Sequence, residues 1–411
     1  MEVIVRNGCG VDVHKRTVVA CLRWIDPGGQ LHKETRTFGT VTQELLALSD
    51  WLSEHEVSHV AMESTGVYWR PVYNILEGQF ELLVVNAAHI KNVPGRKTDV
   101  ADAEWIADLL AVGLLRGSCI PERDTRELRE LVRYRKSLVR DRTAEVNRVQ
   151  KVLEGANIKL SDVATDIMGK SGRAILEGLI EGEDAAEALA ELSKGRLRNK
   201  REELAQALQG RMGTHQRFML RELLGHIDYL NQTIERLETE IEERQRPFEE
   251  EIERLKGVPG LQERQARVVA AELPDVSRFP TAKHLASWAG LAPGNNESAG
   301  KRKSGKITQG NPTLREALIE AAWAAVRSKN TYLSSMYRRL APRRGAKKAI
   351  VAVAHSMLIS IYYMLTRGTD YIELGSTYFD ERHHLRTKNR LVHRLEALGY
   401  QVTLEAVPAA A

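Results

Sequence analysis

Four acidic residues near the start of the chain are of the type that holds metal ions in enzymes acting on nucleic acids. They occur in the phrases Gly-Val-Asp-Val-His-Lys, Ala-Met-Glu-Ser-Thr-Gly and Lys-Thr-Asp-Val-Ala-Asp-Ala-Glu, and they are Asp12, Glu63, Asp99 and Asp102. Two-metal cleavage of a phosphodiester needs several anionic oxygens that converge on cations about 3.5–4 Å apart. We therefore expect a divalent metal site that acts on nucleic acid.

The elements that would position these acids follow from the hydrophobic pattern. It predicts, in chain order, strands over 8–13, 17–25 and 31–38, a helix capped by Thr42 with Leu45, Leu46, Leu48 and Leu52 on its apolar side, a strand over 57–63, a helix over 69–76, a strand over 80–86 and a helix over 98–115. This is the element order of an α/β ribonuclease-H-like fold, in which the first strand, the end of the fourth strand and the last helix meet. The acids fall at those places, and Asp99 and Asp102 share one helix face because they are three residues apart.

Each acid also has an ordinary structural explanation. The helix dipole favours acids in a first turn, which would account for Asp99 and Asp102. Asp12 could be an ordinary strand-end residue, and Glu63 could pair with a basic side chain. Further candidate ligands nearby are His14, Glu104 and Asp108. On the last helix, Glu104 and Asp108 should lie off the shared face or a turn or more along it. The metal hypothesis therefore depends on all four acids falling at the right element ends.

The composition is that of a globular protein with two or three domains. The chain has 411 residues, of which 43% are hydrophobic, and 60 Lys plus Arg against 55 Asp plus Glu give a net charge of +5. Cys9, Cys21 and Cys119 lack metal-ligand spacing, and the N-terminus lacks the apolar core of a signal peptide. We expect a reduced, cytoplasmic protein without zinc or disulfides. The apolar segment 349–366 contains His355 and two tyrosines, which favours a buried helix over a membrane span.

Two long helical segments are predicted beyond residue 120. Residues 126–151 hold nine basic and four acidic residues, so this helix could lie along phosphates or be a solvated helix with ordinary salt bridges. A loop-rich segment is expected over 155–182, which begins and ends with glycine and contains Gly169, Gly172 and Gly178 between them. Spacing typical of a coiled coil follows at Leu220, Leu223, Ile227, Leu230, Ile234, Leu237 and Ile241 and continues at Phe248, Ile252 and Leu255. It favours dimerisation, with an antiparallel hairpin against 126–153 as the alternative.

The last part of the chain holds two glycine-containing motifs. Gly257-Val-Pro-Gly-Leu is either the phosphate-facing turn of a helix-hairpin-helix element or a plain turn between helices. A glycine-bearing loop over 295–311 then carries Ser298 and Ser304 among four nearby cations, before a helix from Pro312. Positive charge would stabilise a pentavalent phosphate, but no histidine lies close in sequence to activate a hydroxyl. On residue chemistry alone, both serines are expected only to contact phosphate.

Several longer phrases resemble the DEDD-type transposases of insertion sequences, which are recombinases guided by a bridge RNA. These phrases include the three quoted above, Val-Asn-Ala-Ala-His-Ile-Lys, and Ala-Gly-Leu-Ala-Pro-Gly-Asn-Asn-Glu-Ser-Ala-Gly-Lys, and the resemblance spans residues 8–370. It implies a RuvC-like domain over 1–120 whose acids Asp12, Glu63, Asp99 and Asp102 bind Mg²⁺. A helical, coiled-coil region over 121–250, a mainly α transposase domain over 251–370 and a basic tail over 371–411 would follow. The tail carries His383, His384, Arg386, Lys388, Arg390, His393 and Arg394 and has no implied role.

The resemblance also implies a reaction and partners. A serine of the last domain would form a covalent link with DNA, and its position in the motif indicates Ser298, with Ser304 as the second choice. Donor and target DNA would be cut and exchanged, with the target chosen by pairing to a guide RNA. Because the metal site of one subunit would assist the serine of another, we expect a homodimer or tetramer, associated with the nucleoid when it acts on DNA and not with a membrane.

Two other classes of function fit parts of the sequence. A RuvC-like, metal-dependent, structure-specific endonuclease would use water as the nucleophile and would form no protein–DNA adduct. A non-enzymatic nucleic-acid-binding scaffold built on the coiled coil would make the four acids dispensable.

Overall fold

The computed structural model describes residues 4–86, 102–273, 275–294, 296–298, 301–382 and 384–404, without the side chains of 296–298, 301–304 and 385–387. Asp99 and His383 lie outside the described residues, as does the predicted start of the helix over 98–115. The chain divides into two compact units, Met1–Pro121 and Glu122–Ala411, each described by itself below.

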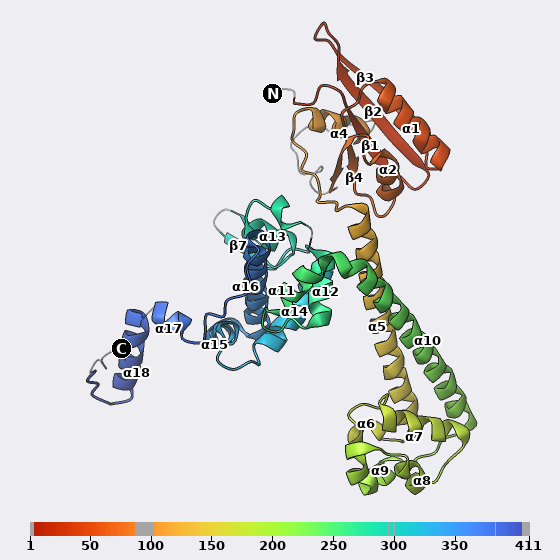
Figure 1. Ribbon diagram of the computed structural model, residues 1–411, viewed down its shortest axis with the longest axis vertical. Coiled ribbons are helices and arrows are strands. Elements are labelled where there is room, and N and C mark those ends of the chain that lie inside the picture. The colour runs from red at the N-terminus through yellow and green to blue at the C-terminus, as the bar shows by residue number, and fades with distance from the viewer. Residues whose placement is uncertain are drawn as a thin grey trace. The chain divides into compact units, whose positions relative to one another are not determined.

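The first unit is built on a mixed five-stranded sheet (Figure 1). The strands are β1 (Gly8–Val13), β2 (Thr17–Ile25), β3 (Leu31–Gly39), β4 (His59–Glu63) and β5 (Glu81–Val85), in the spatial order β3-β2-β1-β4-β5. The first three strands pair antiparallel, whereas β4 runs parallel to both β1 and β5. The predicted element order is confirmed. Parallel pairing brings the carboxyl ends of β1, β4 and β5 to one edge of the sheet.

Helices cover both faces of this sheet. On one face α1 (Thr42–Glu54) and α2 (Trp69–Leu76) pack against alternate strand residues such as Val11 and Met62. On the other face α4 (Asp102–Ala111) packs against Ala61 and Val85. Side chains alternate between the faces of a strand, so a strand covered on both sides is apolar almost throughout. This explains why the Gly8–Val13 strand could be predicted from the sequence and why Asp12 is its one charged residue.

Local details of two predicted helices in this unit were wrong. Val41 occupies the N-cap position of α1, and Thr42 is its first helical residue, with no side-chain cap. Leu46 is 47% exposed, and Trp51 takes its place in the core because it lies on the same face as the other leucines. The helix α4 ends before residue 115 because Gly113 adopts a left-handed conformation, with φ of 66°.

The second unit begins with two long helices, α5 (Arg123–Gly155) and α10 (Thr214–Gln245), which lie side by side (Figure 1). They are antiparallel, because Val132 near the start of α5 clusters with Ile241 near the end of α10, and Val149 clusters with Leu220. The heptad residues of α10 are thus buried against α5 of the same chain. The alternative of an antiparallel hairpin between the two helices is therefore confirmed. A coiled coil between chains is not shown, and the heptad spacing gives no separate support for a dimer.

Short helices between α5 and α10 form a helical cap, residues 156–213, with a hydrophobic core that continues into the ends of both long helices. They are α6 (Leu160–Val163), α7 (Lys170–Glu181), α8 (Ala186–Glu191), the 3₁₀ helix η1 (Gly195–Lys200) and α9 (Arg201–Ala207). The prediction of a loop-rich segment here was wrong. A Cβ on Gly172 would lie 2.2 Å from the carbonyl oxygen of Ile167, so this glycine permits close packing rather than a loop.

The rest of the second unit is a helical bundle around α16 (Ala346–Arg367). Around it lie α11 (Glu249–Lys256), α12 (Glu263–Glu272), α13 (Ala282–Trp288), α14 (Pro312–Ala325) and α15 (Tyr332–Arg344), with the 3₁₀ turns η2 (Arg246–Phe248) and η3 (Val276–Arg278). Within the described part of the chain, α16 alone is long and apolar enough to cross a membrane. Met357, Leu358 and Ile361 are fully buried in the bundle, so α16 is its core helix, as predicted.

The start of the basic tail packs on α15. The rings of Tyr332 and Phe379 stack at 5.1 Å, and Arg339 pairs with Asp380 at 3.1 Å. Both contact residues of the tail lie in the short helix α17 (Tyr378–Arg382), and α18 (His384–Ala397) follows it. The first dozen residues of the tail therefore belong to the bundle.

Candidate active site

Asp12 and Glu63 lie at the carboxyl ends of neighbouring parallel strands. The register of β1 and β4 pairs Gly10 with Ala61 and Val11 with Met62. Asp12 and Glu63 are the next residues of the two strands, so they lie opposite each other in the same register. Paired residues of adjacent strands point to the same side of a sheet. Because Val11 and Met62 face α1 and α2, both acids are on the face that α4 covers.

Glycines in β1 determine where α4 lies on that face. A Cβ on Gly10 would be 2.2 Å from the carbonyl oxygen of Ala103 and 2.3 Å from the backbone nitrogen of Ala107. One on Gly8 would be 3.1 Å from a methyl carbon of Leu110. The helix therefore runs antiparallel to β1, and its first residue, Asp102, lies at the end of β1 that carries Asp12. Three of the predicted acids are thus on elements that meet.

The immediate partners of the two strand acids are polar. The side chain of Asp12 is 16% exposed, and its Oδ2 lies 3.0 Å from Nε2 of His14. The hydroxyl of Thr65 donates a 3.1 Å hydrogen bond to Oε1 of Glu63. His14 thus contacts an acid of the site, and Thr65 orients the other; Thr65 was not singled out from sequence.

The donor set suits a hard divalent cation, because carboxylate oxygens are the ligands that Mg²⁺ and Mn²⁺ prefer. Within the described residues, no three His, Cys, Asp or Glu side chains come close enough together to hold a metal ion. Asp99, the fourth acid, lies outside those residues. Asp12 and Glu63 would hold the ion from the strands and Asp102 from the helix.

Two of the further candidates on α4 have other partners or surroundings. Asp108 accepts hydrogen bonds from Arg23 at 3.3 Å and from Lys33 at 2.7 Å, which fixes α4 to β2 and β3. Glu104 lies near Cys21, whose thiol pKa is raised mainly by burial and to a lesser extent by that carboxylate. These contacts favour a structural role for Asp108. We therefore do not add Asp108 or Glu104 to the candidate metal ligands.

The two candidate serines lie in the second unit, on a short hairpin rather than in the flexible loop expected. Its strands are β6 (Asn296–Ser298) and β7 (Lys301–Ser304), paired antiparallel. Ser298 pairs with Lys301 at the closed end of the ladder, whereas Ser304 pairs with Asn296 at the open end. The hairpin therefore places the two serines at opposite ends of its ladder.

The open end of this serine hairpin is fastened to the bundle. A Cβ on Gly310, whose φ is 46°, would lie 2.2 Å from the backbone nitrogen of Gly290, so the two chain segments touch. Nη1 of Arg315 on α14 donates to the carbonyl oxygens of Thr308 and Gln309 at 3.1 and 2.5 Å. The backbone nitrogen of Gly294 bonds to the carbonyl of Lys306. Both chain segments at the open end of the hairpin are thus held at the start of α14.

A buried carboxylate continues this attachment. Glu272 is fully buried and accepts hydrogen bonds from Arg133 of α5, at 2.7 and 2.8 Å, and from Nδ2 of Asn311, at 2.8 Å. The amide oxygen of Asn311 in turn caps α14 by accepting from the backbone nitrogens of Thr313 and Leu314. The carboxylate also raises the pKa of the Arg133 guanidinium by hydrogen bonding to it. Asn311 before Pro312 is a capping signal in the sequence, but nothing in the sequence pointed to Glu272.

Most cations of the predicted basic helix have partners inside the second unit. Arg129 donates to the carbonyl oxygens of Ala271 and Glu272, and Arg140 pairs with Glu316 at 2.8 Å. Further pairs join Arg135 to Glu238 and Lys136 to Glu316. The salt-bridge interpretation of this helix is therefore favoured over a phosphate-binding one.

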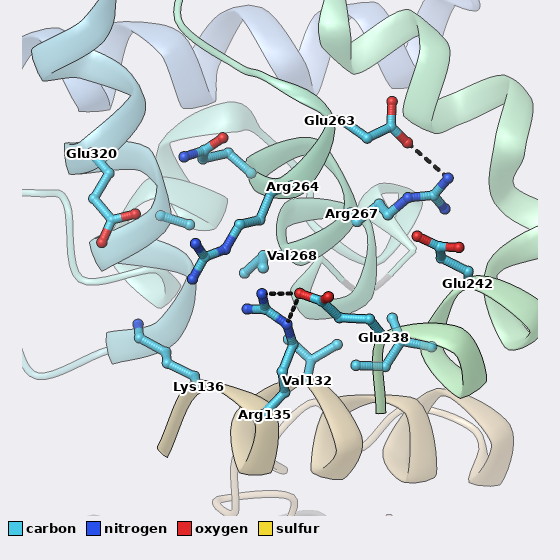
Figure 2. Close-up of a pocket in the computed structure, with 13 residues that line it drawn as sticks. Val132, Arg135, Lys136, Glu238, Glu242, Glu263, Arg264, Arg267, Val268 and Glu320 are labelled. Atoms are coloured by element: carbon cyan, nitrogen blue, oxygen red, sulfur yellow. Dashed lines mark hydrogen bonds and ion pairs between the residues drawn. The ribbon is translucent and has the colours of Figure 1, made fainter. Parts of the chain in front are cut away.

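A cavity of about 260 Å³ lies where α5, α10, α12 and α14 meet (Figure 2). Its charged lining consists of Arg135, Lys136, Arg264 and Arg267 with Glu238, Glu242, Glu263 and Glu320. Several of these groups pair with one another, as Arg267 does with Glu263 at 2.7 Å. Because cations and carboxylates balance, the cavity does not favour an anion.

The mixed sheet with acids at its carboxyl ends, followed by a mostly helical part, is consistent with a ribonuclease-H-like enzyme of the DEDD class. A family model of DEDD transposases from IS110 elements matches residues 9–158, and one described as the transposase IS116/IS110/IS902 family matches residues 252–338. The chain therefore carries both domains of the IS110-type transposases and is an insertion-sequence DNA transposase.

Curated relatives agree with this assignment. The chain is 25% identical, over 70% of its length and 72% of the relative's, to the transposase for insertion sequence element IS1111A of Coxiella burnetii. It is 27% identical, over 68% of its length and 73% of the relative's, to an uncharacterized 43.6 kDa protein of insertion element IS110 of Streptomyces coelicolor. The hypothesis of a non-enzymatic scaffold is therefore not supported, because the families that the chain matches are transposases.

Proposed function

We propose that this transposase cuts and rejoins DNA through a covalent link between Ser298 and a DNA phosphate, assisted by Mg²⁺ bound to Asp12, Glu63, Asp99 and Asp102. The observation that carries the metal part is the register of β1 and β4, which puts Asp12 and Glu63 side by side on the face covered by α4. The serine part is supported by the resemblance of the hairpin segment to the transposase motif and by the position of Ser298 at the closed end of the ladder.

The serine step is a transesterification. The hydroxyl oxygen of Ser298 forms a bond to phosphorus, the bond from phosphorus to a deoxyribose oxygen breaks, and the serine proton leaves for water or the departing oxygen. One P–O ester replaces another, so no external energy source is needed. Rejoining reverses the step with the hydroxyl of another strand.

The chain's own residues have separable tasks in this proposal. Bound Mg²⁺ would supply charge stabilisation for the reacting phosphate. Asp12 and Glu63 hold the ion from a rigid sheet, and Thr65 orients Glu63. Gly290, Gly310 and Arg315 hold the open end of the serine hairpin. Rigid supports matter because catalysis depends on the placement of the reacting groups.

The test is a search for a protein–DNA adduct. Purified protein is mixed with RNA from the flanking region of its element, Mg²⁺ and end-labelled donor DNA, and resolved on a denaturing gel. We expect label on the wild-type protein, and none on Ser298→Ala or Asp12→Ala. The matched control, Ser304→Ala, should keep the adduct. Cleavage without any adduct would establish the endonuclease alternative, and loss in Ser304→Ala alone would move the nucleophile to Ser304.

We also propose that a guide RNA selects the target and that two or four subunits assemble on DNA. Omitting the RNA from the same reaction should abolish the adduct with a specific site. Light scattering of the protein with and without donor DNA should show a dimer or tetramer in the complex. A specific reaction by protein alone, or a monomer in the complex, would contradict these two proposals.

A further inference from the structure

Charge in the C-terminal bundle is distributed very unevenly. Residues 321–369 contain nine Lys and Arg and no Asp or Glu, although the whole chain has 60 basic and 55 acidic residues. This segment covers the end of α14, all of α15 and all of α16. A nearly neutral protein therefore has a long stretch whose positive charge is not balanced along the chain.

The cations of this stretch gather where α15 ends and α16 begins. The two helices pack against each other and are joined by the single residue Gly345, whose φ is 81°. Five exposed cations flank this joint: Arg338, Arg343, Arg344, Lys347 and Lys348. We call them the α15–α16 basic surface.

The structure gives these five cations no carboxylate partners. Across the part of the chain that the structure describes, none of them forms an ion pair, and Arg343 only donates to the backbone carbonyl of Arg339. Their neighbour Arg339 does pair, with Asp380 of the tail. The cations of α5 differ, because most of them are neutralised by acids such as Glu238, Glu272 and Glu316. The basic surface, and not the basic helix of α5, is where positive charge is left for a partner.

We propose that the α15–α16 basic surface binds the phosphate backbone of double-stranded DNA. The enzyme class requires DNA to be held, and exposed arginine and lysine without acidic partners are what a polyanion recognises. A helix rises about 1.5 Å per residue, so Arg338 to Arg344 spans about 9 Å. DNA has one phosphate per about 3.4 Å of axis on each strand, so this span reaches two or three phosphates.

This assignment concerns binding and is independent of the proposed serine chemistry. Phosphate contacts fix the position of a protein on DNA without reading its sequence. Binding to this surface should therefore be independent of sequence and strongly dependent on salt. It can be measured without metal and in Ser298→Ala, so its failure leaves the proposed covalent step unaffected.

The experiment compares two variants that each lose four positive charges. One carries Arg343→Gln, Arg344→Gln, Lys347→Gln and Lys348→Gln. The control carries Lys170→Gln, Lys194→Gln, Arg196→Gln and Lys200→Gln, all exposed in the helical cap. Fluorescence anisotropy of a labelled short duplex of arbitrary sequence is followed over a series of salt concentrations, with circular dichroism to confirm the fold.

We expect the surface variant to bind the duplex at least about tenfold more weakly at about 0.1 M salt. Its slope of log affinity against log salt should fall by about 0.9 for each phosphate that the variant no longer neutralises. The control should keep the wild-type slope. Equal losses in both variants would show a general charge effect and overturn the proposal, as would an unchanged slope in the surface variant. Loss of binding to single-stranded RNA with duplex binding intact would overturn the choice of DNA.

Discussion

At the scale of single residues, Gly10 sets how closely α4 approaches the strand that carries Asp12. Gly10 lets α4 approach β1 so closely that a methyl group there would overlap the carbonyl of Ala103 and the backbone of Ala107. We predict that Gly10→Ala lowers the free energy of unfolding of the first unit by about 1–3 kcal/mol, because backbone and not a flexible side chain must move. Urea denaturation measures this.

The control for this change is Gly225→Ala in α10, where a Cβ meets nothing within 4 Å. Alanine in an open helical position should stabilise by up to about 1 kcal/mol. Equal effects of the two substitutions would contradict the packing argument.

Glu272 supports the attachment of the serine hairpin through Asn311, the residue that caps α14. Removing its side chain leaves Arg129 buried and Arg133 half-buried without their carboxylate. We predict that Glu272→Ala costs about 3 kcal/mol of stability, at the low end of the range for a broken buried pair because Arg133 is partly exposed.

Glu272→Gln separates folding from positioning. The amide keeps the shape, and its one oxygen can still accept from Asn311, but its N–H2 then faces a donor of Arg133 and the negative charge is lost. Stability should therefore recover only in part in chemical denaturation. The serine adduct should recover with it. A variant that regains stability but forms no adduct would show that the charge itself matters to the reaction.

The sequence was informative about some of these residues and silent about others for a physical reason. Asp12 and Glu63 end strands whose local patterns are strong, so their placement on the sheet could be predicted. The partners of Glu272, Arg133 and Asn311, are 139 and 39 residues away in the chain. Contacts of that kind follow from tertiary packing and leave no local pattern.

At the scale of elements, the pairing of α5 with α10 shows the limit of a periodicity. The heptad spacing correctly predicted an apolar seam on α10, but a period does not say whether another chain or another helix covers it. The cations of α5 raised the same difficulty, because a basic helix has the same sequence pattern whether its partners are phosphates or the acids of a neighbouring helix.

A prediction follows for the seam. Ile227 is fully buried with residues of α5 and the helical cap. Ile227→Ala should lower the unfolding free energy by about 2–5 kcal/mol. Because the seam lies within one chain, the loss in denaturation midpoint should be the same at low and high protein concentration. A loss that grows on dilution would indicate that the seam joins two chains.

The core helix α16 contains a titratable group. Burial lowers the pKa of His355 more than its hydrogen bond to the backbone of Leu291 raises it, and its Nδ1 has no partner within the described residues. The neutral form is therefore favoured in the folded protein. Its contribution to stability is complete above the unfolded pKa of about 6.5 and is lost as pH falls through the lower, folded value.

We predict that thermal stability falls between neutral pH and about pH 5, and that His355→Gln reduces this fall. Differential scanning calorimetry over that range tests it. The control is His59→Gln, which alters a partly exposed position in β4 next to a serine hydroxyl. An unchanged pH profile in His355→Gln would assign the titration to another group.

At the scale of the whole molecule, acids and uncompensated cations belong to different units. The candidate metal ligands are in Met1–Pro121, and the α15–α16 basic surface is in Glu122–Ala411. Chelation with EDTA should therefore abolish the serine adduct and leave salt-dependent DNA binding unchanged, and Mg²⁺ or Mn²⁺ should restore the adduct. Loss of both activities on chelation would mean that the metal ion also supports DNA binding.

The antiparallel course of α5 and α10 has a consequence for how this enzyme type diversifies. The chain leaves α5 and returns in α10 at neighbouring points, with the helical cap between them (Figure 1). A segment whose ends lie together can be lengthened, shortened or exchanged with little strain on the rest of the fold. Neither family model covers residues 159–251, which contain most of the cap. The cap is thus a place where one insertion element can acquire a module that another lacks, while the acids and the serine hairpin stay unchanged.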